Sequence, residues 1–286
     1  MLSRFSKRVA LWNTMGTRAQ QSDRDGSSVL EGSTSPSSQA DELPTAADGG
    51  IRLRSIVLDR GGERVFDALT LDLVERRIGI IGDNGAGKSS LLRLIAGLDQ
   101  PVSGQLHVHG HSTPVHHSAV ACRIGFLFQN PDDQIICPTV EEELAFTLVA
   151  QGVSKAQARA QARNFLSDWG LSHWGPRAVS QLSQGQRQKV CLLALQIGKP
   201  LTLLLDEPFA SLDLPSQLRL GRQLLSANQQ LIFSTHVLEQ VYDFERVIWL
   251  ERGKVRADGA GNKVCSAYRD EVSRGACESY QTAEFG

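Results

Sequence analysis

The sequence has no apolar run long enough to cross a membrane. A spanning helix needs about 18 to 20 consecutive and mainly apolar residues, whereas the longest candidates here are short segments such as Val190–Leu195. We therefore expect any transport in which this chain takes part to proceed through partner proteins.

Cysteine is also scarce, and the charge is balanced. The five cysteines are widely spaced and include no C-x-x-C pair, which is typical of reduced thiols in the cytosol and gives no disulfide framework. The formal net charge is −1 at pH 7 with scattered Lys and Arg, so we expect no nucleic-acid partner. With 286 residues, the chain can build one large domain with a tail, or two modest domains, around a core that needs no disulfides.

The beginning of the chain lacks a periodic apolar pattern. Residues 1–50 are rich in Ser, Gly, Asp and Thr, and we expect them to be disordered. Residues 1–20 contain Lys and Arg but no acid, which superficially resembles a transit peptide. We interpret them instead as an unstructured extension or as a start assigned too far upstream. The long apolar segment of a secretory signal is absent, so we expect no export.

The most informative motif covers residues 82–89 and fits the pattern G-x-x-x-x-G-K-[ST]. It lies between the apolar run Ile78–Ile81 and the apolar segment 91–95, the strand–loop–helix setting in which a Gly-rich loop surrounds phosphates. Backbone N–H groups, the helix N-terminus and Lys88 offset the phosphate charge, and Ser89 remains to bind Mg²⁺. The predicted site for a nucleoside triphosphate comprises Gly82, Asp83, Asn84, Gly85, Ala86, Gly87, Lys88, Ser89 and Ser90.

Four further elements follow downstream. The apolar strand at 201–205 ends in Asp206 and Glu207, where Asp206 can orient the Mg²⁺ shell and Glu207 can polarise the attacking water. Gln129 ends a second apolar strand and His236 ends a third, while Leu182–Gln186 precedes a helix. Each element alone has a simpler interpretation: a solvated carboxylate pair, a polar strand end, a core histidine or a helix cap.

In this order, the motifs resemble those of the nucleotide-binding subunit of ABC transporters, over roughly residues 51–257. The resemblance implies an α/β fold: a P-loop ATPase with a RecA-like core, a flanking antiparallel β layer and an inserted helical subdomain at about 130–182. Residues 258–286 would form a C-terminal tail. Helical patterns at Val140–Val149 and, after Ser154, at Lys155–Trp169 lie inside that subdomain. Its size argues against chromosome-maintenance relatives with long coiled coils, and the single cassette argues against translation-associated relatives.

The resemblance also implies roles for individual residues. ATP would lie between two subunits. The family's signature segment, Leu182–Gln186 here, would contact the γ-phosphate bound by the other copy through Ser183, Gly185 and Gln186. Asp213 would link the two sites across the interface. The expected catalytic residues are Glu207, His236 and Gln129, and the expected Mg²⁺ ligands are Ser89, Gln129 and Asp206.

Two positions depart from the family pattern. Gln184 stands where many relatives have Gly, which matters only if the backbone needs a positive φ or close approach to phosphate. Arg60 falls where the family usually stacks a Tyr on adenine. Its guanidinium can stack on a base, or Arg60 can be a solvated turn residue, and the sequence leaves both interpretations open.

The flanking layer begins with Ile51–Leu73, where apolar and polar residues alternate around Gly61 and Gly62, which predicts an antiparallel pair. The segment Leu106–Gly110 extends this layer and would place His107 and His109 on one face. With the nearby His111, His116 and His117, they are either Zn²⁺ or Ni²⁺ ligands or an exposed strand face and loop, since no carboxylate or Cys completes a recognisable metal spacing.

Residues 129–146 resemble the energy-coupling-factor group of vitamin and metal-ion importers. The resemblance implies a short extra helix at 132–136 and two membrane partners: a transmembrane coupling protein docking near Asp132, Asp133, Gln134 and Ile135, and a substrate-capture protein. Mixed acidic and apolar residues suit a basic amphipathic helix, although a surface turn capped by Pro131 and Pro138 is the alternative.

Several phrases, including Pro208–Pro215 and Val247–Leu250, most resemble the biotin-importer ATPases of that group. The alternatives are a cobalt or nickel importer of the same group and a soluble ABC ATPase with no part in transport. We expect ATP and Mg²⁺ as cofactors, a homodimer or a heterodimer with a paralogue, and a peripheral position on the cytoplasmic face of the cell membrane.

Overall fold

The computed structural model describes residues 50–112 and 123–283. Residues 1–49, 113–122 and 284–286 lie outside this description, and so do the side chains of 275–283. The expectation of disorder for residues 1–50 therefore falls almost wholly outside the described part of the chain, as do His116 and His117 of the predicted histidine cluster.

Two sheets form the body of the molecule. A four-stranded antiparallel sheet has the order β2-β1-β4-β5, and a six-stranded sheet has the order β10-β9-β3-β8-β7-β6, in which β10 alone is antiparallel to its neighbour. The strands are β1 (Ile51–Arg60), β2 (Glu63–Leu73), β3 (Arg77–Ile81), β4 (Ser103–Val108), β5 (His111–Ser112), β6 (Ile124–Leu127), β7 (Thr202–Asp206), β8 (Gln230–Ser234), β9 (Arg246–Glu251) and β10 (Lys254–Gly259).

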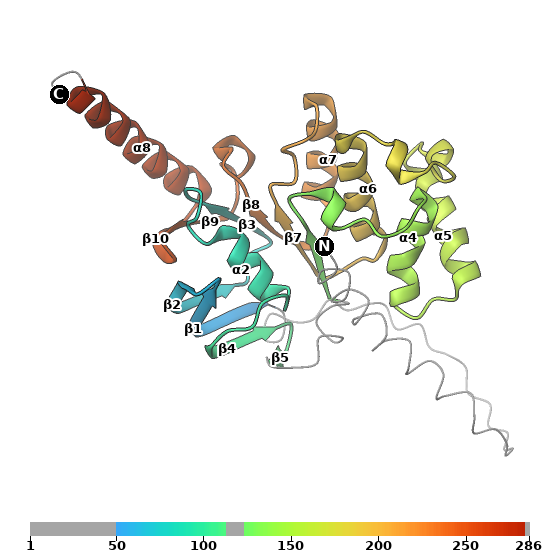
Figure 1. Cartoon of the computed structure of the whole chain (residues 1–286), viewed down its shortest axis with the longest axis horizontal. Coiled ribbons are helices and arrows are strands. Elements are labelled where there is room, and N and C mark those ends of the chain that lie inside the picture. The colour runs from blue at the N-terminus through green and yellow to red at the C-terminus, as the bar shows by residue number, and fades with distance from the viewer. Residues whose placement is uncertain (1–49, 113–122, 284–286) are drawn as a thin grey trace, which may run out of the picture.

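The helices lie on both sides of the six-stranded sheet. Figure 1 shows α4, α5, α6 and α7 gathered at one side of the molecule, α2 beside the four-stranded sheet at the other, and α8 projecting away from the body. The α-helices are α2 (Lys88–Ile95), α4 (Val140–Ala150), α5 (Lys155–Asp168), α6 (Gln184–Ile197), α7 (Leu214–Ser226) and α8 (Gly261–Ala283), and the short 3-10 helices are η1 (Pro131–Asp133), η2 (Ser172–Trp174), η3 (Val179–Gln181) and η4 (Leu238–Gln240).

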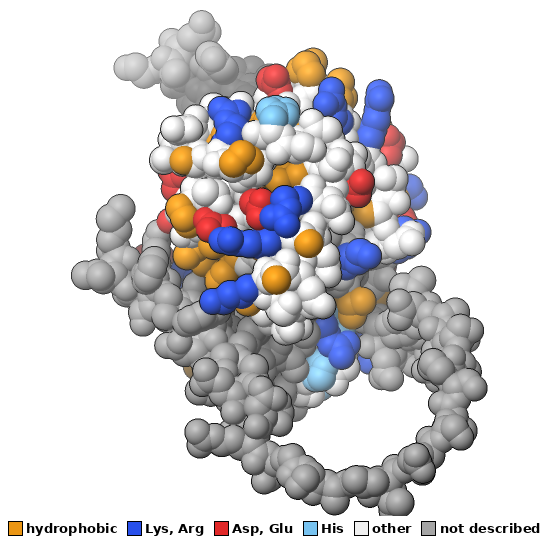
Figure 2. Space-filling model, turned by 90° about the vertical axis from the view of Figure 1, so that its right-hand side faces the viewer, with side chains coloured by type: hydrophobic (Ala, Val, Ile, Leu, Met, Phe, Trp, Pro, Cys, Tyr) orange, Lys and Arg blue, Asp and Glu red, His pale blue; other side chains and the backbone are white. Residues whose placement is uncertain are grey.

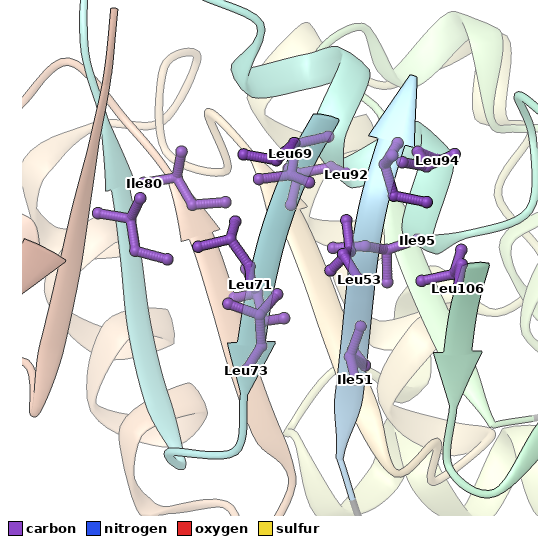
Figure 3. Close-up of a cluster of buried hydrophobic side chains, with 14 of the residues drawn as sticks. Ile51, Leu53, Leu69, Leu71, Leu73, Ile80, Leu92, Leu94, Ile95 and Leu106 are labelled. Atoms are coloured by element: carbon purple, nitrogen blue, oxygen red, sulfur yellow. The ribbon is translucent and has the colours of Figure 1, made fainter. Parts of the chain in front are cut away.

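One apolar core joins the two sheets through α2. Its buried side chains come from β1, β2, β4 and α2 and from one face of β3, β6, β7, β8 and β9. Figure 3 shows side chains of β1, β2, β3, β4 and α2 in this cluster. Successive residues of a strand point to opposite faces, so Ile80 belongs to this core while Ile81 belongs to the core on the other face of the six-stranded sheet. Helix α2, which begins with the phosphate-loop lysine, is thereby fixed between the sheets.

Helix α6 connects the sheet to the helical lobe formed with α4 and α5. Cys191 and Leu192 pack in the core beneath the six-stranded sheet, whereas Val190 and Leu193 pack in the core of the helical lobe. Helical periodicity presents these neighbouring residues to different partners. A shift of the helical lobe therefore acts directly on α6, at whose N-terminus the signature segment lies.

The local sequence accounts for the helix starts of this lobe. The Thr139 side chain caps α4 by accepting from the backbone N–H of Glu142, and the Ser154 side chain caps α5 by accepting from that of Gln157. Three glutamates in the first turn of α4 add a favourable charge at the helix N-terminus. The predicted antiparallel pair and both predicted helices are confirmed.

Two features differ from expectation. Strand β4 ends at Val108, and His109 has a left-handed backbone with φ 46°, so His107 and His109 do not share a strand face. The segment after Asp258 forms the long helix α8. Its first turns are held in the core by Val264 and Cys265.

The surface carries no single-sign charge field on the side that Figure 2 presents. Acidic, basic and apolar side chains are interspersed there, as the balanced composition predicts. In the described part of the chain, no helix combines the length and the apolar character required to cross a membrane.

Candidate nucleotide-binding and hydrolytic site

The carboxyl ends of parallel strands bring the predicted motifs to one edge of the six-stranded sheet. β3 runs into the phosphate loop, β8 precedes His236, β7 ends at Asp206 and β6 precedes Gln129. Because β8 lies between β3 and β7, with β6 beside β7, the motifs follow one another in that spatial order along the edge. Ligands of open α/β sheets bind at this edge.

The phosphate loop needs glycine at its two ends. Gly82 has φ 138°, and a Cβ there would lie 2.1 Å from the carbonyl oxygen of Leu250. Gly87 has φ 105°, and a Cβ there would lie 2.9 Å from the Phe66 ring. Any larger residue would push the loop away from its supports. The crest of the loop, Asp83 to Gly85, is exposed, and no side chain caps the N-terminus of α2, so its first N–H groups are available to phosphate.

Lys88 lies folded into this loop. Its Nζ donates to the backbone oxygens of Gly82 at 2.6 Å and Asp83 at 2.9 Å. Burial lowers the pKa of Lys88, while the negative charges of Glu207, Asp206 and Asp83 act in the opposite direction. The ammonium group is therefore placed between the loop and the carboxylates, where an incoming triphosphate would exchange backbone carbonyls for phosphate oxygens.

Asp206 supplies a buried carboxylate that suits a cation. The residue is 6% exposed. Among the described residues, no hydrogen bond to its carboxylate is formed, and Lys88 and Arg93 act on it through their charge. Together with the Ser89 hydroxyl and the Gln129 amide oxygen, this is the hard oxygen donor set that Mg²⁺ prefers. These residues fit the expected Mg²⁺ site.

Glu207 is held in a strained conformation beside His236. Its backbone is left-handed, with φ 48°, which is uncommon for a residue other than glycine and is found at functional sites. The Glu207 N–H donates to the Ser234 oxygen at 3.0 Å, and His236 Nδ1 lies 2.9 Å from Glu207 Oε1. Glu207 is largely buried, whereas His236 is two-thirds exposed. This arrangement aims a carboxylate at the edge of the sheet and leaves His236 accessible to a ligand.

Gln129 is exposed after β6, and the residues that follow it support its position. Gln134 Oε1 accepts from the backbone N–H of Phe128 at 3.2 Å, and Gln134 Nε2 donates to the Cys191 oxygen at 3.5 Å. Gln134 is 3% exposed. Its expected role as a docking contact is wrong in this structure, because its amide is used to join the segment to α6. The expected short helix at 132–136 is the 3-10 helix η1, which covers Pro131–Asp133.

The signature residues cap their own helix. The Ser183 side chain accepts from the N–H of Gln186 at 3.3 Å, and Gln186 Oε1 accepts from the N–H of Ser183 at 3.0 Å, which is a capping box. A Cβ on Gly185 would lie 2.8 Å from the Ser211 oxygen, so glycine allows α6 to approach the segment before Asp213. Gln184 is not among the described residues with positive φ, and its backbone therefore tolerates the departure from Gly.

Arg60 contacts the helix of the phosphate loop. It is exposed at the end of β1, and its Nη1 donates to Ser90 Oγ at 3.3 Å. Ser90 itself is 7% exposed. Of the two interpretations of Arg60, stacking on adenine stays a prediction. The other interpretation, a solvated turn residue, holds only in part, because Arg60 is exposed but its guanidinium is bonded to Ser90.

Comparison with known proteins agrees with the geometry. The family model described as ABC transporter matches residues 67–210. The chain belongs to the ABC transporter family. It is 43% identical over 218 residues to the biotin transport ATP-binding protein BioM of Rhodobacter capsulatus, covering 76% of this chain and 93% of that protein. It is 34% identical over 220 residues to BioM of Rhizobium etli, covering 77% and 98%.

The solved structure of cbiO1 from Clostridium perfringens, part of the ABC transporter complex cbiONQ, has a TM-score of 0.66 and 23% identity, covering 80% of this chain and 94% of that chain. At this identity the likeness shows the fold. The predicted α/β ABC ATPase fold is confirmed, and as an ABC protein the chain is an ATPase that binds ATP.

The structure also contains two contacts at this ABC ATPase site that the motifs do not predict. Arg187, directly after the signature segment, forms an ion pair with Asp132. Tyr268 of α8 donates to Asp83 of the phosphate loop. Each pair is far apart in sequence, and neither partner belongs to a motif that specifies the other.

Two of the histidines predicted as possible metal ligands have other partners, since His109 Nε2 contacts Thr202 and His107 Nδ1 contacts Ser112. No group of three or more potential ligands that could hold a metal is formed by the described His, Cys, Asp and Glu residues.

Proposed function

We propose that this chain is the ATP-hydrolysing subunit of a biotin importer of the energy-coupling-factor type. The observation that carries the proposal is the 43% identity to a biotin transport ATP-binding protein over 93% of that protein's length, joined to a complete set of hydrolytic residues at one edge of the sheet. The ATPase does not contact the vitamin, so the identity to proteins named for biotin transport carries the choice of solute.

Within one copy, the chain's own residues bind and orient ATP. The phosphate-loop N–H groups and Lys88 hold the phosphates. Ser89, Gln129 and Asp206 would hold Mg²⁺, which would supply further positive charge against the phosphates. Glu207 accepts the proton of the attacking water. His236, whose Nδ1 lies beside Glu207, contacts the γ-phosphate through its exposed ring.

A second copy, or a paralogous ATPase, completes each site. The capping box leaves the N-terminus of α6 exposed, and this end carries the partial positive charge of the helix. Ser183, Gly185 and Gln186 bind the γ-phosphate on the facing subunit. The bonds between Ser183 and Gln186 are exchanged for bonds to phosphate when the dimer closes. Asp213 caps α7 and directly follows Ser211 and Leu212, which pack against Gly185; it links the two sites.

Hydrolysis is transmitted to the membrane through the segment after Gln129. η1 carries Asp132 and Asp133 at the surface, and Ile135 packs between two apolar cores. A transmembrane coupling protein docks a basic helix on these carboxylates at the cytoplasmic face of the membrane. A displacement of η1 by the docked helix is transmitted to α6, because η1 and α6 are in direct contact. A separate membrane protein captures the vitamin.

The proposal is tested by uptake of labelled biotin at limiting concentration in cells that lack the gene. The wild-type gene and a Glu207→Gln variant are returned to these cells, and cobalt and nickel uptake are measured in parallel. We expect biotin uptake to be lost, restored by the wild type and not restored by the variant. Impaired metal uptake with unchanged biotin uptake would favour a metal importer. No defect in any of the three would contradict a transport function and leave a soluble ATPase.

A further inference from the structure

A side chain of the C-terminal helix contacts the phosphate loop. The Tyr268 hydroxyl donates to Asp83 Oδ1 at 2.8 Å, across 185 positions of sequence. The Tyr268 ring packs edge-on against Trp249 of β9, with centroids 5.1 Å apart and an interplanar angle of 89°. The phosphate loop is therefore in contact with an element that carries none of the nucleotide motifs.

The position of Tyr268 is fixed by the buried residues at the start of α8. Val264, one turn earlier on α8, and Cys265 are buried in the core beneath the six-stranded sheet. The N–H of Gly261, at the start of α8, donates to the Phe244 oxygen at 3.1 Å. The first two turns of α8 are thus anchored to the body of the molecule, and they present the hydroxyl at a defined place beside the loop.

Other contacts from the same part of the chain support the loop backbone. The Gly253 N–H, in the turn after β9, donates to the Ala86 oxygen at 3.0 Å. The Leu250 oxygen packs against Gly82, 2.1 Å from the position that a Cβ on this glycine would take. These contacts hold the backbone at both ends of the loop, whereas Tyr268 holds a side chain at its crest. The hydrogen bond to Asp83 therefore differs from these contacts, because it fixes a side chain and not the backbone of the loop.

The charge of Asp83 explains why its side chain needs to be held. Asp83 is an acidic residue in a loop that receives a polyanion, and like charges at close range repel. Its carboxylate already acts on Lys88. Burial lowers the pKa of Lys88, and the negative charge of Asp83 opposes part of this lowering. A carboxylate that is free to rotate would spend part of its time near the phosphates or near the Lys88 ammonium. A carboxylate bonded to Tyr268 stays on the side of α8.

We propose that Tyr268 is a positioning residue for ATP binding, which holds the Asp83 carboxylate against α8 and away from the triphosphate. Tyr268 acts on ATP through Asp83 and takes no part in activating water. The proposal rests on the ATP site and is independent of which solute is transported. Burial and the bond to Asp83 raise the pKa of Tyr268 to about 12, so the hydroxyl is a donor over the whole range of an ATPase assay.

The test is Tyr268→Phe in the full-length chain, which removes the hydroxyl and keeps the ring on Trp249. We expect the Kd for MgATP, measured by titration with a fluorescent ATP analogue, and the KM for ATP to rise about threefold to tenfold, which corresponds to the loss of a modest hydrogen bond. The kcat should stay within about twofold, because Glu207 and its water are untouched. The matched control is Tyr242→Phe, an equally small change at an exposed tyrosine outside the loop.

A double-mutant cycle separates positioning from packing. Asp83→Asn removes the charge that Tyr268 holds, so Tyr268→Phe should change Kd and KM little when it is added to Asp83→Asn, whatever Asp83→Asn does on its own. The proposal is overturned if Tyr268→Phe leaves Kd and KM of the wild type unchanged, or if it raises them as much in the Asp83→Asn background. It is also overturned if kcat falls in parallel with a lower Tm, since that result indicates a structural role. Biotin uptake is not part of this readout, so failure here leaves the proposed transport function intact.

Discussion

Arg187 and Asp132 form an ion pair that joins the helix of the signature segment to the segment after Gln129. The Arg187 side chain is 28% exposed and that of Asp132 is 59% exposed, so the pair lies at the surface with the carboxylate on the outside. Asp132 is therefore both the internal partner of α6 and an expected contact for a basic helix of the coupling protein. If the coupling protein docks here as proposed, its cation would compete with Arg187, and this competition would link partner binding to the position of α6.

The first prediction separates these two roles of Asp132 by exchanging the charges. Asp132→Arg alone places two cations together and should destabilise the chain by about 0.2–1 kcal/mol, the range for partly exposed pairs. Adding Arg187→Asp restores the pair and should recover the stability. Biotin uptake should stay low in the double variant, because the surface charge offered to the membrane partner remains reversed.

Thermal unfolding and biotin uptake are measured on the wild type and on both variants, and soluble ATPase activity serves as the control for an intact site. Recovery of uptake in the double variant would mean that only the internal pair matters. In that case the docking role of Asp132 is wrong.

The second prediction concerns the separate roles of Lys88 and Glu207. Lys88→Ala should weaken ATP binding and abolish hydrolysis, because the phosphate charge is no longer offset. Glu207→Gln should retain ATP but lower kcat by about 10²- to 10⁴-fold, the typical contribution of a general base. Size-exclusion chromatography with ATP should show a stable dimer for Glu207→Gln and a monomer for Lys88→Ala. A Glu207→Gln variant that stays monomeric and hydrolyses normally would exclude Glu207 as the base.

The parts of the site that the sequence predicts are those with local causes. The phosphate loop is specified by adjacent residues, and buried parallel strands are visible as apolar runs with polar ends at Gln129, Asp206 and His236. Their order in the chain resembles that of ABC transporter ATPases, and this resemblance predicted a common site. The structure supplies the physical reason, because the carboxyl ends of such parallel strands meet at one edge of the sheet. The cap at Ser183 is likewise local, since Gln186 three residues later completes a capping box.

The contacts that the sequence does not predict depend on tertiary placement. Tyr268 and Asp83 meet because α8 is anchored beside β9, which no local pattern encodes. Gln134 looks like a surface residue in sequence, yet it is buried because both ends of its amide find hydrogen-bond partners. His109 follows the end of β4 and has a left-handed backbone. The alternation of side chains along a strand, which predicted that His107 and His109 share a face, therefore does not extend to His109.

The third prediction tests whether the signature segment acts on the partner's nucleotide. Ser183→Arg and Lys88→Ala should each be inactive alone. In a mixture, half of the dimers pair one variant with the other, and one site of such a dimer has an intact phosphate loop and an intact facing signature. ATPase activity should therefore reappear in the mixture, at a level reduced by coupling between the two sites. If the mixture is no more active than Lys88→Ala alone, the arrangement in trans is wrong.

The fourth prediction concerns acid stability and follows from His109. Its Nε2 lies 2.7 Å from Thr202 Oγ1, and the Thr202 hydroxyl donates to Gln230 Oε1 at 2.8 Å. Because the Thr202 hydroxyl gives its only proton to Gln230, His109 donates to Thr202 Oγ1 through Nε2. Burial, and then the nearby charges of Arg123 and His111, lower the pKa of His109 from 6.5 to about 4.

This pKa shift fixes the direction of the pH dependence. The unfolded chain binds a proton at His109 near pH 6.5, whereas the folded chain does so only near pH 4. The stability contributed by His109 is therefore fully present above about pH 6.5 and is lost as the pH falls toward 4. After allowance for partial exposure of the site, a contribution of about 1 kcal/mol corresponds to about 2–4 °C in Tm for a domain of this size.

Replacing His109 by Gln keeps a donor near Thr202 and removes the titrating group. The loss of Tm between pH 7 and pH 4.5 should therefore be smaller in His109→Gln than in the wild type by about 2–4 °C. His173→Gln is the matched control, because this histidine is exposed on the helical lobe and its replacement should leave the difference between the two pH values unchanged. Thermal unfolding followed by circular dichroism at several pH values provides the measurement. An equal loss of Tm in wild type and His109→Gln would mean that His109 is not held neutral by the fold, and that the acid sensitivity of the chain comes from other groups.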